Sequence, residues 1–247
     1  SMKLKREPFI RGKTVDLRPV EFSDVPLVAK WINDPDATQF MFTGQLPTSE
    51  RQGRELVRGY IENPHHVVFI IVEKVTRQPV GFAGLFELYG MSSYAGKFLP
   101  GFIASWYSST GSGDYRILIG EKKFWNKGYG AQVCALLTHY GFDRLNLNVM
   151  ALGLTRADNR GAIQLYERLG YRFCGIKRRS MYRNGRYYDA ALMDILREEY
   201  YKTYLHEYEQ AFGVSSAVNF LFDKAGEREL QKRDADIKRT YYGKRKN

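Results

Sequence analysis

The stretch that decides the fold is ILIGEKKFWNKGYGAQ, residues 117–132. An apolar strand runs into a turn with two glycines, and a helix with one apolar face follows over 128–142. The first amides of a helix have no partner within the helix, and the helix dipole favours negative charge at that end. Because glycines let a ligand approach the backbone closely, the stretch predicts a cradle for a diphosphate.

Three lysines of the same stretch, Lys122, Lys123 and Lys127, are expected to supply positive charge beside the phosphates. Taken alone, a Gly-x-Gly pair before a helix is also compatible with an ordinary tight turn. The stretch is not a Walker A loop, which requires Gly-Lys-Ser/Thr, and it lacks the third glycine of the dinucleotide-binding fingerprint.

A second motif, ADNRGAIQLYERLGY over 157–171, follows about thirty residues later. A strand over 149–154 precedes it, and a short helix over 161–169 ends at Gly170. The order strand, WNKGYG, helix, strand, ADNRGAIQLYERLGY resembles the GNAT superfamily of N-acetyltransferases. It is most similar to the branch of the ribosomal-protein (Rim-type) and polyamine acetyltransferases. The first strand with LRP (17–19) and the hairpin YRNGRYYD (182–189) also suit that branch, so the resemblance covers residues 10–198.

The resemblance implies an α/β (α+β) fold with a mixed, mostly antiparallel central sheet flanked by helices. Two neighbouring parallel strands of this sheet would splay apart and admit the pantetheine arm of acetyl-CoA. Carried over by position, these strands are 115–120 and 149–154. The cofactor-binding residues implied on the first strand and in the turn are Leu118, Ile119 and Gly120 for the pantetheine amides, and Trp125, Asn126, Lys127, Gly128, Tyr129, Gly130 and Ala131 for the pyrophosphate. Trp125 stands where many relatives have Gln or Arg.

Two residues of the second motif have implied roles at the thioester end. Asn159 would hydrogen-bond the cofactor arm, and it is equally suited to be the N-cap of the short helix. Tyr166 lies where the family has a tyrosine whose hydroxyl protonates the departing thiolate. The alternative for Tyr166 is an aromatic ring packed on the apolar face of its helix.

The implied reaction is direct attack of an amine on the acetyl thioester, without a covalent enzyme intermediate. Cys134 lies within the first predicted helix, and no histidine is placed to activate it. A group must remove a proton from the ammonium of the acceptor. Asp114, at the start of the splayed strand, and Glu87, at the end of the preceding strand, are the two candidates.

Composition limits the function classes. The 247 residues carry a net charge of +11, which suits an anionic ligand or nucleic acid without choosing between them. No apolar run approaches the ~20 residues of a membrane span, and residues 1–7 do not start a signal peptide, so we expect a cytoplasmic protein. Cys134 and Cys174 read as small buried residues, and with four scattered histidines they predict no metal site.

Two domains are predicted: an acetyltransferase domain over 1–198 and a helical extension with a basic tail over 199–247. Residues 88–113 are rich in glycine, serine and aromatic residues and read as an irregular insertion, either a lid or a passive loop. Strands over 67–72 and 80–87 form a hairpin, and Asn184-Gly185 is a two-residue turn. The chain thus alternates strands and helices around one sheet.

The acceptor is less certain from sequence. A basic strand and hairpin suit an anionic acceptor such as a nucleotide-linked amino sugar or an amine on RNA, or they carry solvated charges. These basic residues are Arg172, Lys177, Arg178, Arg179, Arg183 and Arg186. They suit polycationic polyamines or aminoglycosides poorly, because such acceptors need carboxylates. Another small amine is also open, and the family branch indicates instead a protein N-terminal amine. A homodimer, a contact with RNA or the ribosome, and a CoA-binding module without turnover stay open.

Overall fold

We analysed a computed structural model of the chain, which describes residues 7–89 and 111–215. The chain divides into two compact units, Ser1–Val214 and Ser215–Asn247, and the fold below is that of the first. Most of the segment 88–113, predicted to be an insertion, lies outside the described residues. Its two ends differ from the prediction, because residues 88–89 and 112–113 belong to strands.

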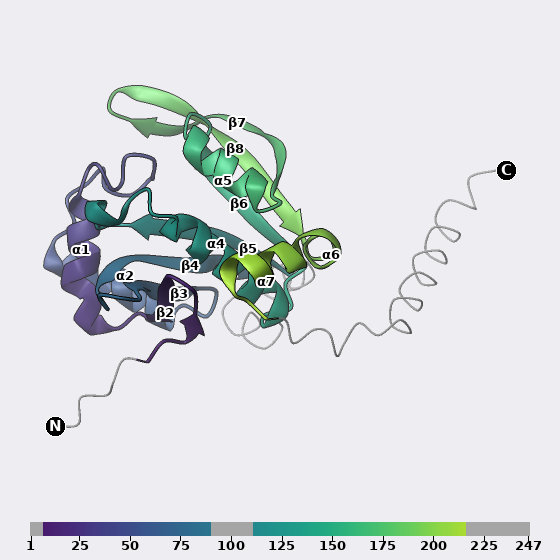
Figure 1. Cartoon of the computed structure of the whole chain (residues 1–247). Coiled ribbons are helices and arrows are strands. Elements are labelled where there is room, and N and C mark those ends of the chain that lie inside the picture. The colour runs from purple at the N-terminus through teal and green to yellow at the C-terminus, as the bar shows by residue number, and fades with distance from the viewer. Residues whose placement is uncertain (1–6, 90–110, 216–247) are drawn as a thin grey trace, which may run out of the picture. The chain divides into compact units, whose positions relative to one another are not determined.

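Eight strands form one sheet (Figure 1), in the spatial order β1-β2-β3-β4-β5-β6-β8-β7. All neighbours run antiparallel except β5 and β6, which run parallel. This mixed, mostly antiparallel sheet confirms the predicted fold class. The strands are β1 (Ile10–Arg11), β2 (Val15–Pro19), β3 (Val67–Glu73), β4 (Pro79–Tyr89), β5 (Ser112–Ile119), β6 (Val149–Arg156), β7 (Arg172–Arg183) and β8 (Arg186–Leu196).

Helices cover both faces of the sheet, which explains why β3 is apolar without alternation. Val68 and Ile70 pack in the cluster that contains the residues of α1 and α2, whereas Phe69 and Ile71 pack in the cluster that contains α4. The helices are α1 (Val25–Asn33), α2 (Glu50–Glu62), α4 (Tyr129–Asp143), α5 (Arg160–Arg168), α6 (Arg197–Glu199) and α7 (Leu205–Phe212), with short turns η1 (Phe22–Asp24) and η3 (Lys122–Phe124) and a π-helical turn η4 (Tyr200–Tyr204). Among the described helices, none is long and apolar enough to cross a bilayer.

The helix from 197 to 212 packs against the sheet domain. Tyr200 and Tyr208 are fully buried in the same cluster as α4, and Gln132 of α4 donates to the carbonyl of Phe212 at 3.1 Å. A Cβ at Gly170, whose φ is +90°, would lie 2.6 Å from the ring of Tyr204. This close approach explains why the helix before Gly170 ends in a glycine.

Local signals in the chain are confirmed at several turns. Ser49 and Gln52, a Ser-x-x-Gln pattern typical of a helix start, form the capping box of α2, and the predicted turn Asn184-Gly185, both at positive φ, closes the β7–β8 hairpin. Asp24 precedes α1 as predicted, but its carboxylate forms a buried pair with Arg18 at 2.7 Å instead of capping the helix.

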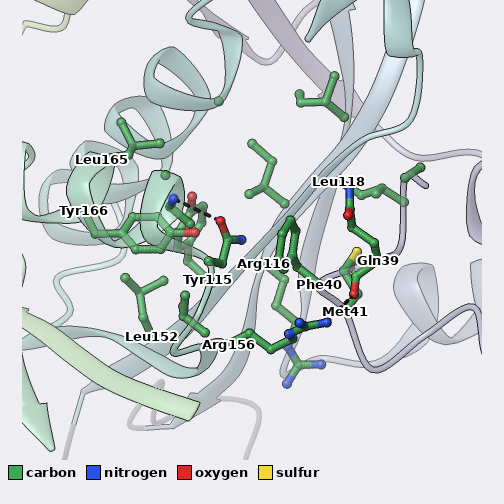
Figure 2. A pocket seen from close by; sticks show the side chains of 18 of the residues that line it. Gln39, Phe40, Met41, Tyr115, Arg116, Leu118, Leu152, Arg156, Leu165 and Tyr166 are labelled. Atoms are coloured by element: carbon green, nitrogen blue, oxygen red, sulfur yellow. Dashed lines mark hydrogen bonds between the residues drawn. The ribbon is translucent and has the colours of Figure 1, made fainter. Parts of the chain in front are cut away.

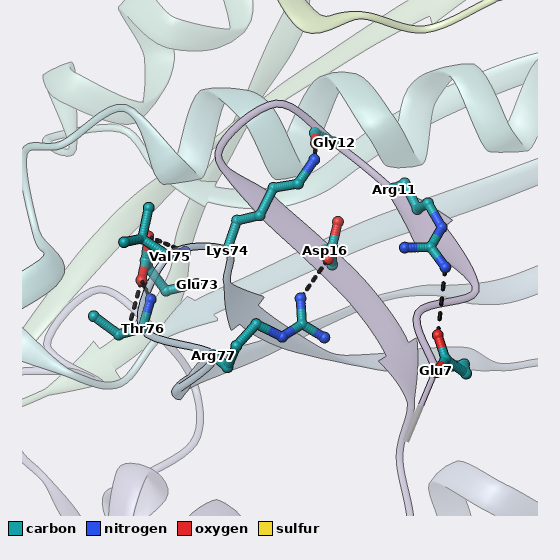
Figure 3. Close-up of polar contacts among 9 residues, drawn as sticks. All are labelled: Glu7, Arg11, Gly12, Asp16, Glu73, Lys74, Val75, Thr76 and Arg77. Carbon is teal, nitrogen blue, oxygen red and sulfur yellow. Dashed lines mark hydrogen bonds and ion pairs between the residues drawn. The ribbon is translucent and has the colours of Figure 1, made fainter. Parts of the chain in front are cut away.

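Polar contacts fix the turn between β3 and β4 (Figure 3). The backbone N–H and the hydroxyl of Thr76 both donate to Glu73 Oε2 at 2.6 Å. These bonds lower the pKa of Glu73 to about 2. Arg77, at φ +58°, reaches back to Asp16 of β2 at 2.6 Å and joins the turn to the neighbouring strand.

Candidate active site

The two parallel strands diverge along their length. The β5–β6 ladder pairs only residues 112–114 with 149–151, although β5 continues to Ile119 and β6 to Arg156. On the other side of β6, a register shift between Leu152 and Thr155 interrupts its pairing with β8. The predicted splay is therefore present, and it begins directly after Asp114.

A cavity of about 800 Å³ lies at this splay (Figure 2). Its walls are the diverging halves of β5 and β6, the turn and first residues of α4, the first residues and inner face of α5, and the loop segment 36–43 after α1. The cavity therefore brings together both sequence motifs with a loop that neither motif contains.

One end of the cavity is formed by backbone amides. Gly128 is the N-cap of α4 at φ +79°, and a Cβ there would meet nothing within 4 Å. The first helical hydrogen bond is donated by Gln132 to the Gly128 carbonyl, so the amides of residues 129–131 have no acceptor within the helix. Gly128 to Ala131 all line the cavity. This end fits a diphosphate in space and in the direction of its donors.

Two of the three predicted phosphate lysines are engaged elsewhere. Lys122 lies 3.1 Å from Asp34 and also pairs with Asp36. The ammonium of Lys123 donates to the side chain of Gln78 at 2.7 Å. The phosphate role of Lys122 stays a prediction, and in this structure its side chain is directed to the α1–α2 loop.

The third lysine and one unpredicted arginine remain near this end. The ammonium of Lys127 lies 5.2 Å from the ring centroid of Phe124, on the surface of the turn. Arg168, at the end of α5, lines the cavity itself. Sequence reasoning missed Arg168 because nothing in the motif distinguishes it from the other charged residues of α5.

The backbone of β5 presents alternate residues to the cavity. Gly120 donates its N–H to the Val80 carbonyl, and Leu118 pairs with Phe82 in the same register, so both turn their amides toward β4. The Gly120 N–H is thus already paired within the sheet, and the predicted roles of Gly120 and Leu118 at the pantetheine arm stay predictions. Ile119 is a non-hydrogen-bonded position of the β4–β5 ladder, so its main-chain N–H and C=O point away from β4, toward the cavity. Its carbonyl accepts from the indole of Trp125 at 2.8 Å, which leaves its N–H as the donor.

Asn159 is the N-cap of α5, where its Oδ1 accepts from the Ala162 N–H at 3.2 Å. It also lines the cavity, with its amide nitrogen available as a donor. Trp125, Asn126, Tyr129 and Gly130 line the same cavity. The capping role and a ligand-binding role are thus compatible at Asn159.

Tyr166 lies between the two walls with its hydroxyl directed into the cavity (Figure 2). Its ring packs edge-to-face on Tyr115 at 5.8 Å and against Tyr171 at 6.0 Å. Burial raises the pKa of Tyr166 well above its ordinary value, so the phenol is protonated at neutral pH. The same aromatic contacts keep the ring in place, so packing and proton donation are not exclusive.

Asp114 occupies the point where the strands separate. Gly153 of β6 donates its N–H to Asp114 Oδ1 at 3.2 Å, and Arg116 lies 3.5 Å from Oδ2. Burial raises the pKa of Asp114 above its ordinary value, although both partners oppose the shift. Glu87 is exposed, at φ +53°, and pairs with Arg116 at 3.0 Å outside the cavity wall. Of the two predicted bases, the structure brings only Asp114 to the cavity.

The basic residues of β7, predicted to border the acceptor, do not line the cavity. Arg172 pairs with Glu199 at 3.0 Å, and Arg178 and Arg179 are exposed on the edge strand. Arg183 is buried and donates to the α1–α2 loop, in contrast to the solvated charge expected. Cys174 of the same strand is exposed, which corrects the prediction that both cysteines are buried.

The cavity wall opposite the phosphate end was not predicted. It consists of Phe40 and Met41 of the α1–α2 loop together with Arg156 of β6, whose guanidinium lies 3.7 Å from the ring centroid of Tyr188 (Figure 2). These residues meet across more than a hundred positions of sequence, so no local pattern indicates them. In the ranges 7–89 and 111–215, no group of three or more His, Cys, Asp or Glu side chains is placed to hold a metal ion.

Three comparisons place these features among known proteins. The family model of the acetyltransferase (GNAT) domain matches residues 14–172. The chain is 24% identical over 188 residues to the uncharacterized N-acetyltransferase p20 of Bacillus licheniformis, which covers 74% of this chain and 93% of that protein.

Solved structures share the fold. The spermidine N-acetyltransferase of Vibrio cholerae in complex with CoA and spermine superposes with a TM-score of 0.64 at 22% identity, over 76% of this chain and 98% of that one. A GNAT-family acetyltransferase from Bacillus anthracis gives 0.60 at 18% identity, over 77% and 99%.

Proposed function

The chain belongs to the GNAT family and is an acetyl-CoA-dependent N-acetyltransferase, and on this premise we propose that its acceptor is a small cationic primary amine acetylated at the β5–β6 splay. The observation that carries the proposal is the single cavity that joins the free amides of α4 to Asp114 and Tyr166. In it a diphosphate at one end and an amine at the other are held by different elements.

We propose that the amides of residues 128–131 bind the pyrophosphate and that Asn159 and the Ile119 N–H hold the pantetheine arm. The acetyl thioester then lies between Asp114 and Tyr166. Holding amine and thioester in one cavity replaces an encounter in solution with an oriented contact. This proposal rests on the geometry of unpaired donors rather than on positive side chains, since Lys122 is engaged with Asp34.

The proton transfers follow from the two raised pKa values. Asp114, deprotonated above its raised pKa, accepts a proton from the acceptor ammonium, and the neutral amine attacks the thioester carbonyl. The carbon–sulfur bond breaks, and the Tyr166 phenol donates its proton to the departing thiolate. Tyr166 recovers a proton from solvent after the products leave. Cys134 takes no part, because it is fully buried and burial raises the pKa of its thiol to about 12.

The charges beside Asp114 favour a cationic acceptor over an anionic one. Among residues 7–89 and 111–215, Arg116 is the one cation within ion-pair distance of Asp114 and Glu87, so this group of three carries a net negative charge. A nucleotide-linked amino sugar would bring two phosphates toward it, whereas an ammonium is attracted. The Vibrio cholerae structure with spermine is that of an enzyme with a polycationic acceptor.

Finer assignments also belong to this proposal. The LRP of β2 and Trp125 favour the Rim-type and polyamine branch of the family, with a protein N-terminal amine as the second acceptor class. We keep the division into an acetyltransferase domain over 1–198 and an extension over 199–247. A cytoplasmic location, a homodimer and a contact with RNA or the ribosome stay predictions.

A thiol-release assay tests the proposal. Purified protein is incubated with acetyl-CoA and, in turn, spermidine, 2-phenylethylamine, glucosamine, a UDP-linked amino sugar and a peptide with a free N-terminus. We expect CoA release with at least one of the cationic amines and little with the UDP-linked sugar. Tight acetyl-CoA binding without thiol release from any amine would indicate a CoA-binding module. Preference for the UDP-linked sugar would refute the acceptor class.

A further inference from the structure

Two buried arginines join the α1–α2 loop to the other side of the cavity. Arg156, the last residue of β6, is 8% exposed, and Arg183, the last residue of β7, is 7% exposed. Buried guanidinium groups are costly unless their donors are satisfied. The partners of these two groups therefore show which contacts the fold maintains.

In the part of the chain that the structure describes, the hydrogen bonds of Arg183 all go to the loop. Its Nη1 lies 3.1 Å from the carbonyl oxygens of Met41 and of Thr43, and its Nη2 lies 3.2 Å from the hydroxyl of Thr38. Among the described residues, no carboxylate lies within ion-pair distance of Arg183. Its donors thus bind three neutral oxygens of one six-residue segment, across about 140 residues of sequence.

Arg156 of β6, which is separated from β7 by β8 in the sheet, holds the same segment. Its Nη1 donates to the carbonyl of Gln39 at 2.8 Å, while Asp158 accepts from its Nε at 2.9 Å. The guanidinium lies between two rings, 4.9 Å from the centroid of Phe40 and 3.7 Å from that of Tyr188 (Figure 2). Arg156 therefore determines where Phe40 stands in the cavity wall.

The loop is also shaped to receive these donors. The Thr38 side chain is fully buried and its hydroxyl donates to the Asp34 carbonyl at 2.9 Å, which leaves its lone pairs for Arg183. Gly44 at φ +83° passes so close that a Cβ there would lie 2.2 Å from the Thr38 hydroxyl. Loop and arginine thus form one packed unit, whose outer residues Phe40, Met41 and Phe42 line the cavity.

We infer that Arg183 is a positioning residue for the acceptor: with Arg156 it fixes segment 38–43 as the acceptor wall and so sets amine specificity, without acting on acetyl-CoA. The inference rests on the proposed function for the location of the acceptor. None of the residues that Arg183 contacts belongs to α4, α5 or the splayed part of β5, which form the acetyl-CoA half. Loss of the contacts between Arg183 and segment 38–43 should consequently change the KM of the amine but not the KM of acetyl-CoA.

The test compares Arg183→Met with Arg178→Met, a control that removes an exposed arginine from the same strand. With the best amine of the acceptor screen, we expect Arg183→Met to raise the KM of the amine about tenfold or more. The KM of acetyl-CoA and the calorimetric Kd of CoA should stay within about twofold. Arg183→Lys should restore part of the amine affinity, because an ammonium reaches some of the three oxygens.

A second variant keeps the test decisive if Arg183→Met does not fold, which the absence of a cooperative thermal unfolding transition would reveal. Thr38→Val removes one acceptor of Arg183 and should raise the amine KM about threefold, with CoA affinity unchanged. The inference is overturned if every variant that folds keeps the amine KM of the wild-type protein. It is also overturned if a folded variant loses as much CoA affinity as amine affinity.

Hydrogen exchange separates this inference from the proposed function. In the wild-type protein the Met41 amide donates to the Thr38 carbonyl at 2.9 Å and should be protected. Arg183→Met should accelerate exchange in 38–43 at least about tenfold, with no change in 129–143. If the wild-type protein shows no turnover, only the proposed function is refuted. If exchange in 38–43 is unchanged in Arg183→Met, the positioning role of Arg183 is refuted, whatever the activity.

Discussion

The two halves of the cavity are built in different ways. The half proposed for acetyl-CoA consists of main-chain groups, the Gly128 turn and the first amides of α4, which lie within sixteen consecutive residues. The half proposed for the acceptor consists of side chains from the α1–α2 loop and β6, and Arg183 of β7 binds this loop across about 140 positions of sequence. The difference teaches that a cofactor held by backbone can be predicted from a short motif, whereas an acceptor wall held by side chains requires the whole fold.

The largest expected effect tests the main-chain half. Gly128→Glu adds bulk at φ +79° and a negative charge where the diphosphate is expected, and we predict at least about 100-fold weaker CoA binding by calorimetry. Gly185→Glu is the matched control, since Gly185 has φ +78°, equally open surroundings and a place in the β7–β8 turn. Similar losses in both variants would mean that strain, rather than the phosphate site, is responsible.

The next effect concerns the junction of the two halves. Tyr166→Phe removes the proposed proton donor but keeps the ring, so kcat should fall about 100-fold while CoA affinity stays nearly constant. Tyr171→Phe serves as control, because its hydroxyl is bonded to Thr138 at 2.7 Å, away from the cavity. A Tyr166→Phe enzyme with wild-type kcat would exclude Tyr166 as the acid.

A smaller effect is expected in the pH profile. Burial raises the pKa of Asp114, so kcat/KM should fall as the pH falls through this raised value, where the carboxylate becomes protonated and can no longer accept a proton. Arg116 opposes the shift, and Arg116→Met should therefore move the acid limb to higher pH. Arg116→Lys should leave the limb close to its wild-type position. A limb that stays fixed in Arg116→Met would assign it to another group.

The smallest effect tests the side chains of the phosphate end. Arg168→Met should weaken CoA binding about fivefold at low salt, because Arg168 lines the cavity. Lys122→Met should change CoA binding by less than about twofold, since Lys122 pairs with Asp34 and Asp36. A larger loss of CoA affinity in Lys122→Met than in Arg168→Met would assign the phosphate contact to Lys122. It would contradict the side-chain directions in the structure.

Much of the fold was predictable because local patterns and tertiary contacts agree. The Ser49–Gln52 capping box, the Asn184-Gly185 turn and the glycines around Gly128 each act within a few residues. The apolar run of β3 indicated burial on both faces, and α1, α2 and α4 provide it. The splay beyond Asp114 was implied only by the family resemblance.

The remainder depended on contacts that no local pattern encodes. Arg183 lies in a basic run and reads as a solvated charge, yet the loop carbonyls of Met41 and Thr43 bury it. Asp114 and Glu87 were equivalent in sequence, and only the register of β4 on β5 places one at the cavity and the other outside. Positions set by main-chain conformation, such as the Gly128 turn, were therefore easier to anticipate than contacts between distant side chains.

The position of bound CoA is the most direct test of the central claim. A crystal structure of the complex should show pyrophosphate oxygens within hydrogen-bonding distance of the N–H groups of residues 128–131. It should also place the sulfur between β5 and β6, beside the hydroxyl of Tyr166. A pyrophosphate bound elsewhere, or a sulfur remote from that hydroxyl, would contradict the assignment of the splay as the site of acetyl transfer.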